Sequence, residues 1–75
     1  MARKFTAYIE RDPDTGLYVA TVPGLAGAHT QAASLDELQR NLEEVLALVL
    51  EDMGERGEAV EVGEFVGIQQ VEIAN

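Results

Sequence analysis

Three acidic residues near the start of the chain are spaced closely enough to bind metal ions together. Glu10, Asp12 and Asp14 alternate along the sequence. Two-metal nucleases hold their ions about 4 Å apart with converging carboxylates, and this cluster would be the candidate ligand set. The same residues surround the segment "RDPDTG", where acidic side chains are usual turn formers. The sequence therefore favours a turn over a metal site.

His29 is the one histidine of the chain, and there is no cysteine. A lone histidine without an adjacent serine or cysteine nucleophile is a poor candidate for a general base. It also cannot complete a zinc site of the Cys/His type, and a disulfide framework is excluded. We therefore expect no catalytic residue, no metal and no cofactor.

A glycine-containing corner is the third candidate for chemistry. In "VPGLAG", Gly24 and Gly27 have the GxxG spacing of an RNA-backbone clamp. Such a clamp lies between helices and carries polar or basic residues, whereas this segment lies between strand-like segments and has an apolar interior. Pro23 cannot donate to a strand ladder, and the two glycines permit backbone angles closed to other residues. The sequence favours a structural corner formed by Pro23, Gly24 and Gly27.

The elements that position these residues begin with short strands. Period-two alternation predicts strands over residues 5–10 and 17–22. Between them, Asp12, Pro13 and Gly16 are typical of a hairpin loop. Both faces of the second strand carry apolar residues, which favours a central strand or one that a partner buries. The segment "GAHTQA" then predicts a short third strand.

A helix is predicted from Leu35 to about Met53. Ser34 and Glu37 have the S-x-x-E spacing of a capping box, and Gly54 is the expected residue just past the helix end. One apolar stripe at helical spacing is expected to face the core. Its members are Leu35, Leu38, Leu42, Val45, Leu46, Val49 and Met53.

Leu48 and Leu50 do not fit this stripe. At about 100° per residue they lie on its opposite flanks and widen the apolar arc to roughly 200°. Either the helix is wedged deeply into a small core, or another chain buries part of it. We favour the second interpretation because one small sheet can hardly cover so wide an arc.

A last strand is predicted over residues 65–73. Val66 and Ile68 share one face, whereas Val71 and Ile73 share the other. A bulge, or burial on both sides at a subunit contact, would explain the switch. The expected fold is a single α+β domain over residues 1–75 in the order β-β-β-α-β, with a three-stranded antiparallel meander, one helix packed across it and a further strand.

Charge and size narrow the class of partner. The chain has 75 residues and a net charge of −9, from 14 acidic and 5 basic side chains. Such a field repels phosphates, so we expect no direct nucleic-acid binding; it suits a basic partner or simply solubility. A domain this small has a marginal core, and without disulfides or metals it can gain stability from self-association. We therefore predict a homo-oligomer, either a dimer or a tetramer. With neither a signal peptide nor a membrane span in the sequence, we expect a cytoplasmic protein.

The sequence resembles the HicB-like antitoxins, the small acidic partners of HicA-type toxins. The resemblance rests on the aromatic-containing first strand, the hairpin "DPDTGLYVATVPGLAG", the passage "TQAASLDELQRNLEEVL" and the strand that follows. It covers residues 5–55 closely and the tail loosely. The usual corner of the family is closer to "PDLPGC", and Ala26 and Ala28 stand here in place of the proline and cysteine. The resemblance implies a partial RNase H-like fold without nuclease activity.

Many such antitoxins carry a C-terminal domain that binds operator DNA. The chain ends at Asn75, directly after the predicted last strand. We therefore expect a stand-alone form without that domain, and operator binding is not carried over.

The resemblance also implies a function, which is to neutralise a small basic RNA-cleaving toxin by masking it. We predict that carboxylates of the helix guide the encounter and that exposed leucines anchor the contact. Two alternatives are a stand-alone homo-oligomeric binding module of unknown ligand and an enzyme with an unrecognised site. The predicted partner-binding residues, from charge and helical position, are Glu43, Glu44, Leu48, Leu50, Glu51, Asp52 and Glu55.

Overall fold

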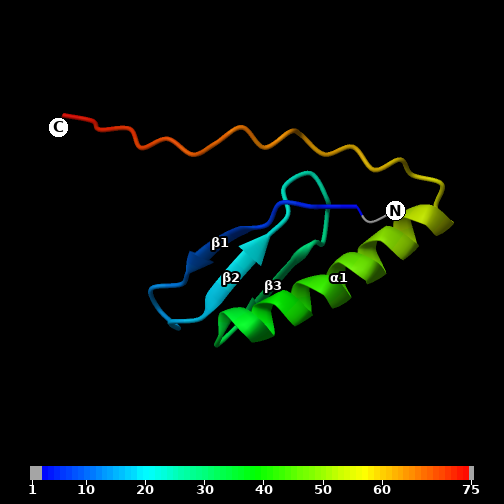
Figure 1. Cartoon of the computed structure of the whole chain (residues 1–75), viewed down its shortest axis with the longest axis horizontal. Coiled ribbons are helices and arrows are strands. Elements are labelled where there is room, and N and C mark those ends of the chain that lie inside the picture. Colours follow the sequence, from blue (N-terminus) through cyan, green and yellow to red (C-terminus); the bar gives the residue numbers. More distant parts are fainter. Residues whose placement is uncertain (1–2, 75) are drawn as a thin grey trace.

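The computed structural model describes residues 3–74 of the chain. It contains β1 (Tyr8–Arg11), β2 (Tyr18–Thr21), β3 (His29–Ala32) and α1 (Leu35–Glu55) in that order. The strands form one antiparallel sheet in the order β1-β2-β3, so β2 is central, and α1 lies across one face of the sheet (Figure 1). The predicted α+β class and three-stranded meander are confirmed, and each strand is shorter than its predicted range.

The turn between β1 and β2 is organised by Asp12. Its carboxylate accepts hydrogen bonds from the Asp14 N–H at 3.0 Å and from the Thr15 hydroxyl at 3.1 Å. Its backbone N–H donates to the Leu17 carbonyl and its carbonyl accepts from the Gly16 N–H, both at 2.8 Å. Gly16 has a φ of 75°, which glycine adopts without strain. Both carboxylate oxygens of Asp12 thus serve the turn, as predicted.

The corner between β2 and β3 is also the structural turn that the sequence predicts. Gly24 and Gly27 have φ angles of 92° and 82°, in the left-handed region that favours glycine. Pro23 lies exposed just beyond the end of β2. Leu25 is only 5% exposed and packs into the core. Burial of this side chain ties the corner to the fold, which is the opposite of what a nucleic-acid clamp requires.

The start of α1 shows the Ser34 half of the predicted capping box. Ser34 lies in extended backbone, and its Oγ accepts a hydrogen bond from the Glu37 N–H at 3.2 Å. This bond satisfies one of the backbone donors that a helix leaves unpaired at its start. Asp36 and Glu37 lie in the first turn, where the helix dipole favours negative charge.

The end of α1 corrects the sequence prediction. The helix continues to Glu55, so Gly54 lies inside it rather than just past its end. Gly57 takes the left-handed conformation instead, with a φ of 68°. Its N–H donates to the Gly54 carbonyl at 3.2 Å, and the Glu58 N–H donates to the Met53 carbonyl at 2.9 Å. This pair of bonds is the Schellman pattern, which places the terminal glycine at residue 57.

The core lies between α1 and the half of the sheet formed by β2 and β3. Ala20 and Ala32 are small enough for the helix to approach the sheet closely, and Leu38 and Leu42 fill the remaining space with exposures of 1% and 6%. The predicted stripe is therefore correct at its centre, although Leu35 at one end is 54% exposed. The other members, which are partly buried, are Val45, Leu46, Val49 and Met53.

The first strand is left uncovered by the helix. Within residues 3–74, α1 packs on β3 and on β2 but not on β1. Ile9 of β1 pairs with Ala20 of β2 and so belongs to the helix-facing side of the sheet. It is nevertheless 49% exposed, because no part of α1 reaches it.

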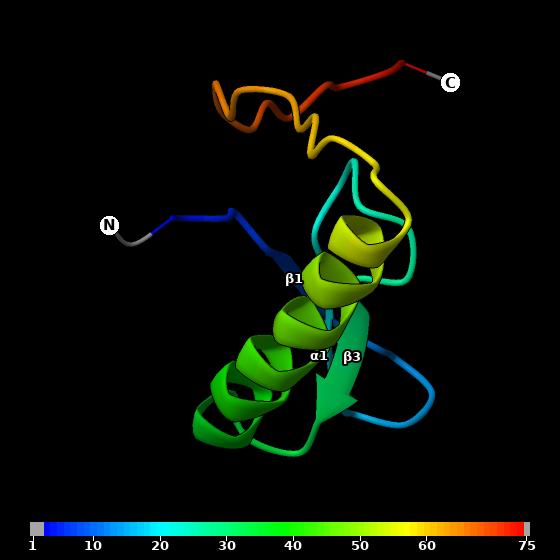
Figure 2. The same ribbon diagram turned by 90° about the vertical axis from the view of Figure 1, so that its right-hand side faces the viewer.

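The C-terminal segment, residues 58–74, corrects the prediction of a fourth strand. It follows an extended path past the sheet, and no strand forms over residues 65–73 (Figures 1 and 2). A β-strand is defined by hydrogen bonds to a neighbouring strand, and alternation of side chains cannot supply that neighbour. Within the described residues the fold is three strands followed by one helix.

Candidate functional site

An exposed leucine surrounded by carboxylates is the main feature of the outer surface of α1. Leu48 is 65% exposed. Its helical neighbours at positions −4, +3, +4 and +7 are Glu44, Glu51, Asp52 and Glu55, and all four are exposed. We call these five residues the acidic flank. It combines one apolar contact point with a rim of negative charge.

The acidic flank lies on the β3 side of the helix. Asn41 Nδ2 donates a hydrogen bond to the Gln31 carbonyl of β3 at 3.2 Å. Leu48 follows Asn41 by about two helical turns and so projects from nearly the same side. Since β3 is an edge strand, the acidic flank and the β3 edge are neighbours on the surface.

Two of the predicted partner-binding residues lie elsewhere. Leu50 is half-buried and packs against the core cluster of Val22, Leu25 and Ala28, so the expectation that it is an exposed anchor is corrected. Glu43 is exposed, but at 100° per residue it lies roughly 140° around the helix from Leu48. The structure thus brings five of the seven predicted residues together and separates Glu43 and Leu50 from them.

Arg56 is a member of this surface that the sequence prediction did not include. Its Nη2 lies 2.8 Å from Asp52 Oδ2, and its Nη1 pairs with Glu58. Both side chains of the Arg56–Asp52 pair are more than half exposed, so the pair adds little stability. Its effect is to neutralise part of the acidic flank at the end of the helix. The four-residue spacing of Asp52 and Arg56 is the signal that would have revealed it.

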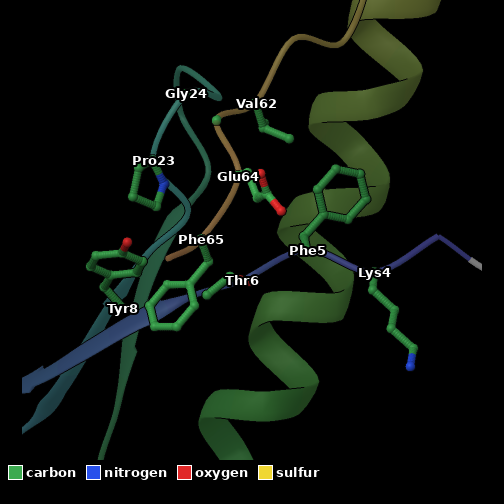
Figure 3. A pocket seen from close by; sticks show the side chains of 10 residues that line it. Lys4, Phe5, Thr6, Tyr8, Pro23, Gly24, Val62, Glu64 and Phe65 are labelled. Atoms are coloured by element: carbon green, nitrogen blue, oxygen red, sulfur yellow. The ribbon is translucent and has the colours of Figure 1, made fainter. Parts of the chain in front are cut away.

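A pocket of about 390 Å³ lies beside the beginning of β1. It is lined by residues 4–6 and Tyr8, by Pro23 and Gly24 of the corner, and by residues 62–65 (Figure 3). The rings of Tyr8 and Phe65 meet edge to face with centroids 5.8 Å apart. Lys4 extends away from the pocket in Figure 3. Through the Tyr8–Phe65 contact, the C-terminal segment meets the beginning of β1 at this pocket.

The residues that the sequence offers for chemistry lie apart on the surface that the structure describes. Among residues 3–74 no group of three or more His, Cys, Asp and Glu side chains is placed to hold a metal ion. His29 lies exposed on β3, and Glu10 lies exposed on β1. Over the same residues, no helix has the length and apolar character needed to cross a membrane.

The sequence of the chain matches a known protein family. Residues 5–73 match the family described as HicB-like antitoxin of bacterial toxin–antitoxin system. The match therefore includes most of the C-terminal segment as well as the sheet and helix. No solved structure shows a significant match to the chain.

Curated relatives match over nearly the whole chain. A UPF0150 protein of Thermotoga maritima is 48% identical over 69 residues, which cover 92% of this chain and 88% of the relative. A UPF0150 protein of Archaeoglobus fulgidus is 50% identical over 70 residues, covering 93% and 94% of the two chains. A third, from Synechocystis, is 41% identical over 69 residues, covering 92% and 93%. By its family match and by these relatives, the chain belongs to the HicB-like antitoxin family.

Proposed function

We propose that this protein is an antitoxin that neutralises a small, basic, RNA-cleaving toxin of the HicA type by covering the surface with which the toxin meets RNA. Membership of the antitoxin family supports the role. The single observation that carries the mechanism is the acidic flank, in which the exposed Leu48 stands among four carboxylates.

The physical basis of the proposal is complementary charge. A protein that binds RNA presents cations to the phosphates, and a surface of carboxylates competes for the same cations. The net charge of −9 draws such a toxin in, and the acidic flank orients it on the β3 side of the helix. Leu48 then loses its contact with water against the toxin and slows dissociation. Bound toxin is blocked sterically, without chemistry on the part of the antitoxin.

Reversal of two charges on the acidic flank tests the electrostatic part. We expect the double substitution Glu51→Lys and Asp52→Lys to slow toxin association about fivefold at low salt and much less at high salt, since ions screen charge–charge attraction. The measurement is the association rate constant by stopped-flow at two ionic strengths. The matched control is Glu10→Lys with Asp14→Lys, an equal change in net charge at the far hairpin. Equal slowing by both double variants would remove the acidic flank from the interface.

Several further properties belong to the same proposal. We propose that the protein is not an enzyme, that it binds no nucleic acid directly, that it works in the cytoplasm and that it forms a homo-oligomer. The partial RNase H-like relationship implied by the resemblance stays a prediction. The alternative function, a stand-alone homo-oligomeric binding module, is favoured by a different observation, the exposed apolar side chains of the C-terminal segment.

Purification from native cells distinguishes these functions. A stoichiometric basic protein of about the same size, released at high salt, is the result expected for an antitoxin. A clean homo-oligomer without a second protein would instead favour the binding module. RNA turnover by the isolated protein that stops on chelation of metal ions would overturn the non-enzymatic role.

A further inference from the structure

The C-terminal segment keeps an unusual amount of apolar surface in water. Val66, Ile68, Val71 and Ile73 are 91%, 83%, 80% and 76% exposed. Two of these side chains point to each face of an extended chain, as in a strand that is covered on both faces. Exposure of four large aliphatic side chains within eight residues costs solvation free energy that burial would recover. Such a surface indicates a site of contact with another polypeptide.

The beginning of the segment is held against its own fold. Phe65 packs edge to face on Tyr8, the first residue of β1 (Figure 3). Val62 approaches Gly24 so closely that a Cβ at Gly24 would lie 3.3 Å from Val62 Cγ1. In Figure 1 the segment then continues in the same general direction as β1 and passes beyond the sheet. Its start is anchored, and only its end lacks a partner.

The length of the segment exceeds what its own sheet can pair. β1 has four residues and spans roughly 13 Å at 3.3 Å per residue. Residues 66–74, when extended, span roughly 30 Å. Since Phe65 already stands at Tyr8, most of this length lies past the end of β1. The apolar side chains near the C-terminal end therefore lie beyond the stretch of β1 that could pair with them.

A second copy of the same chain offers the surface that fits. Within residues 3–74, β1 pairs with β2 on one edge and no strand pairs with its other edge. Ile9 lies beside that edge, half-exposed because α1 does not cover it. An open edge with an adjacent apolar side chain is the usual acceptor for an added strand.

Charge favours the same pairing over a basic partner. The acceptor region carries Arg3, Lys4 and Arg11, three of the five cations of the chain. The C-terminal segment carries Glu58, Glu61, Glu64 and Glu72 and no cation. A basic protein would be repelled from the β1 side, whereas residues 66–74 of another copy bring Glu72 and no cation to it.

We infer that residues 66–74 form the missing fourth strand in trans, adding to the β1 edge of a second copy that returns its own segment in exchange. The exchange obeys two-fold symmetry and closes, which gives a dimer. It leaves the acidic flank, on the β3 side, open in both copies. The inference rests on the homo-oligomeric part of the proposed function and is independent of the toxin.

Cross-linking between two different single-cysteine variants tests this exchange. The chain has no cysteine of its own, so Ile9→Cys and Val71→Cys each introduce one thiol at an exposed site. The two full-length variants, carrying tags of different size, are unfolded and refolded together and treated with a short bis-maleimide. We expect a heterodimer that contains both tags, and a mass by light scattering of twice the 8.1 kDa chain. The control pair is Ile9→Cys with Leu48→Cys, a similarly exposed thiol on the β3 side, and we expect little product from it.

The other outcomes count against the inference in distinguishable ways. A dimeric mass with no more 9–71 product than the control pair would overturn strand exchange and leave self-association standing. A monomeric mass would overturn both the strand exchange and the homo-oligomer. In a double variant with both cysteines in one chain, a link that forms only within that chain would show that the segment folds back on its own β1, which also overturns the exchange.

Discussion

Leu38→Ala will lower the free energy of unfolding by about 3 kcal/mol, the largest stability loss that we expect from any single truncation in this chain. Leu38 is 1% exposed and is the largest side chain that the fold buries completely. It packs with Ala20, Ala32 and Leu42, and the alanines cannot move to fill the cavity left behind. At about 0.05–0.15 kcal/mol of stability per residue, a chain of 75 residues has about 4–11 kcal/mol in all, so this loss removes a large fraction of it.

Urea denaturation followed by far-UV circular dichroism measures this loss. The matched control is Leu35→Ala, the same truncation one helical turn earlier at a side chain that is 54% exposed. We expect the control to change the free energy of unfolding by less than about 1 kcal/mol. All samples need the same protein concentration, since self-association would add to stability. Equal losses for the two variants would contradict the packing of α1 described above.

Leu48→Ala should show the opposite behaviour, with a weaker complex and an unchanged fold. Leu48 is 65% exposed, so its truncation leaves no cavity and should alter stability by no more than about 0.5 kcal/mol. Burial of the same side chain against the toxin would contribute about 1.5 kcal/mol, so its loss should raise the dissociation constant roughly tenfold. The effect should appear mainly in the dissociation rate, because the charges that guide encounter are untouched.

Isothermal titration with the co-purified toxin provides the dissociation constant. Leu35→Ala again serves as control, since it removes the same atoms from the same helix without a ring of carboxylates around them. Its affinity should stay within about twofold of the unsubstituted protein. If Leu48→Ala binds as tightly as the control, the acidic flank is not the toxin contact. The result leaves the strand exchange at β1 untouched, because that contact lies on the other side of the sheet.

The local elements were predictable because their signals act over a few residues. The alternation in "LYVATV" predicts β2, and Asp12 with Gly16 predicts the hairpin loop before it. Ser34 predicts the helix start, which its hydrogen bond to the Glu37 N–H confirms. In the hairpin loop and at the helix start the hydrogen-bonding partner is five residues away or fewer, so a short sequence window contains the whole interaction. For β2 the window contains the side-chain alternation, whereas the hydrogen-bonding partners lie in β1 and β3.

The C-terminal end of α1 shows where local signals become ambiguous. Gly54 and Gly57 are both suitable as terminal glycines, and the sequence alone predicts Gly54. The structure ends the helix at Glu55 and gives the positive φ to Gly57. With these two further residues in the helix, Met53 packs against the core cluster and Asp52 pairs with Arg56. Tertiary packing decides between two glycines that local propensity treats alike.

By itself, the sequence determined the three-stranded meander, the corner, the helix start and the negative charge. Side-chain alternation, turn residues and capping residues act over a few neighbouring positions, and the charge follows from composition alone. Only the tertiary structure decided that Leu50 packs into the core while Leu48 remains outside it. The two leucines have the same side chain and lie on opposite flanks of one stripe, and the corner between β2 and β3 covers only the flank of Leu50. The structure likewise decided that residues 65–73 form no strand within the chain. Strand formation depends on hydrogen bonds to a distant neighbour, and alternation in the sequence specifies the side chains of a strand but not its partner.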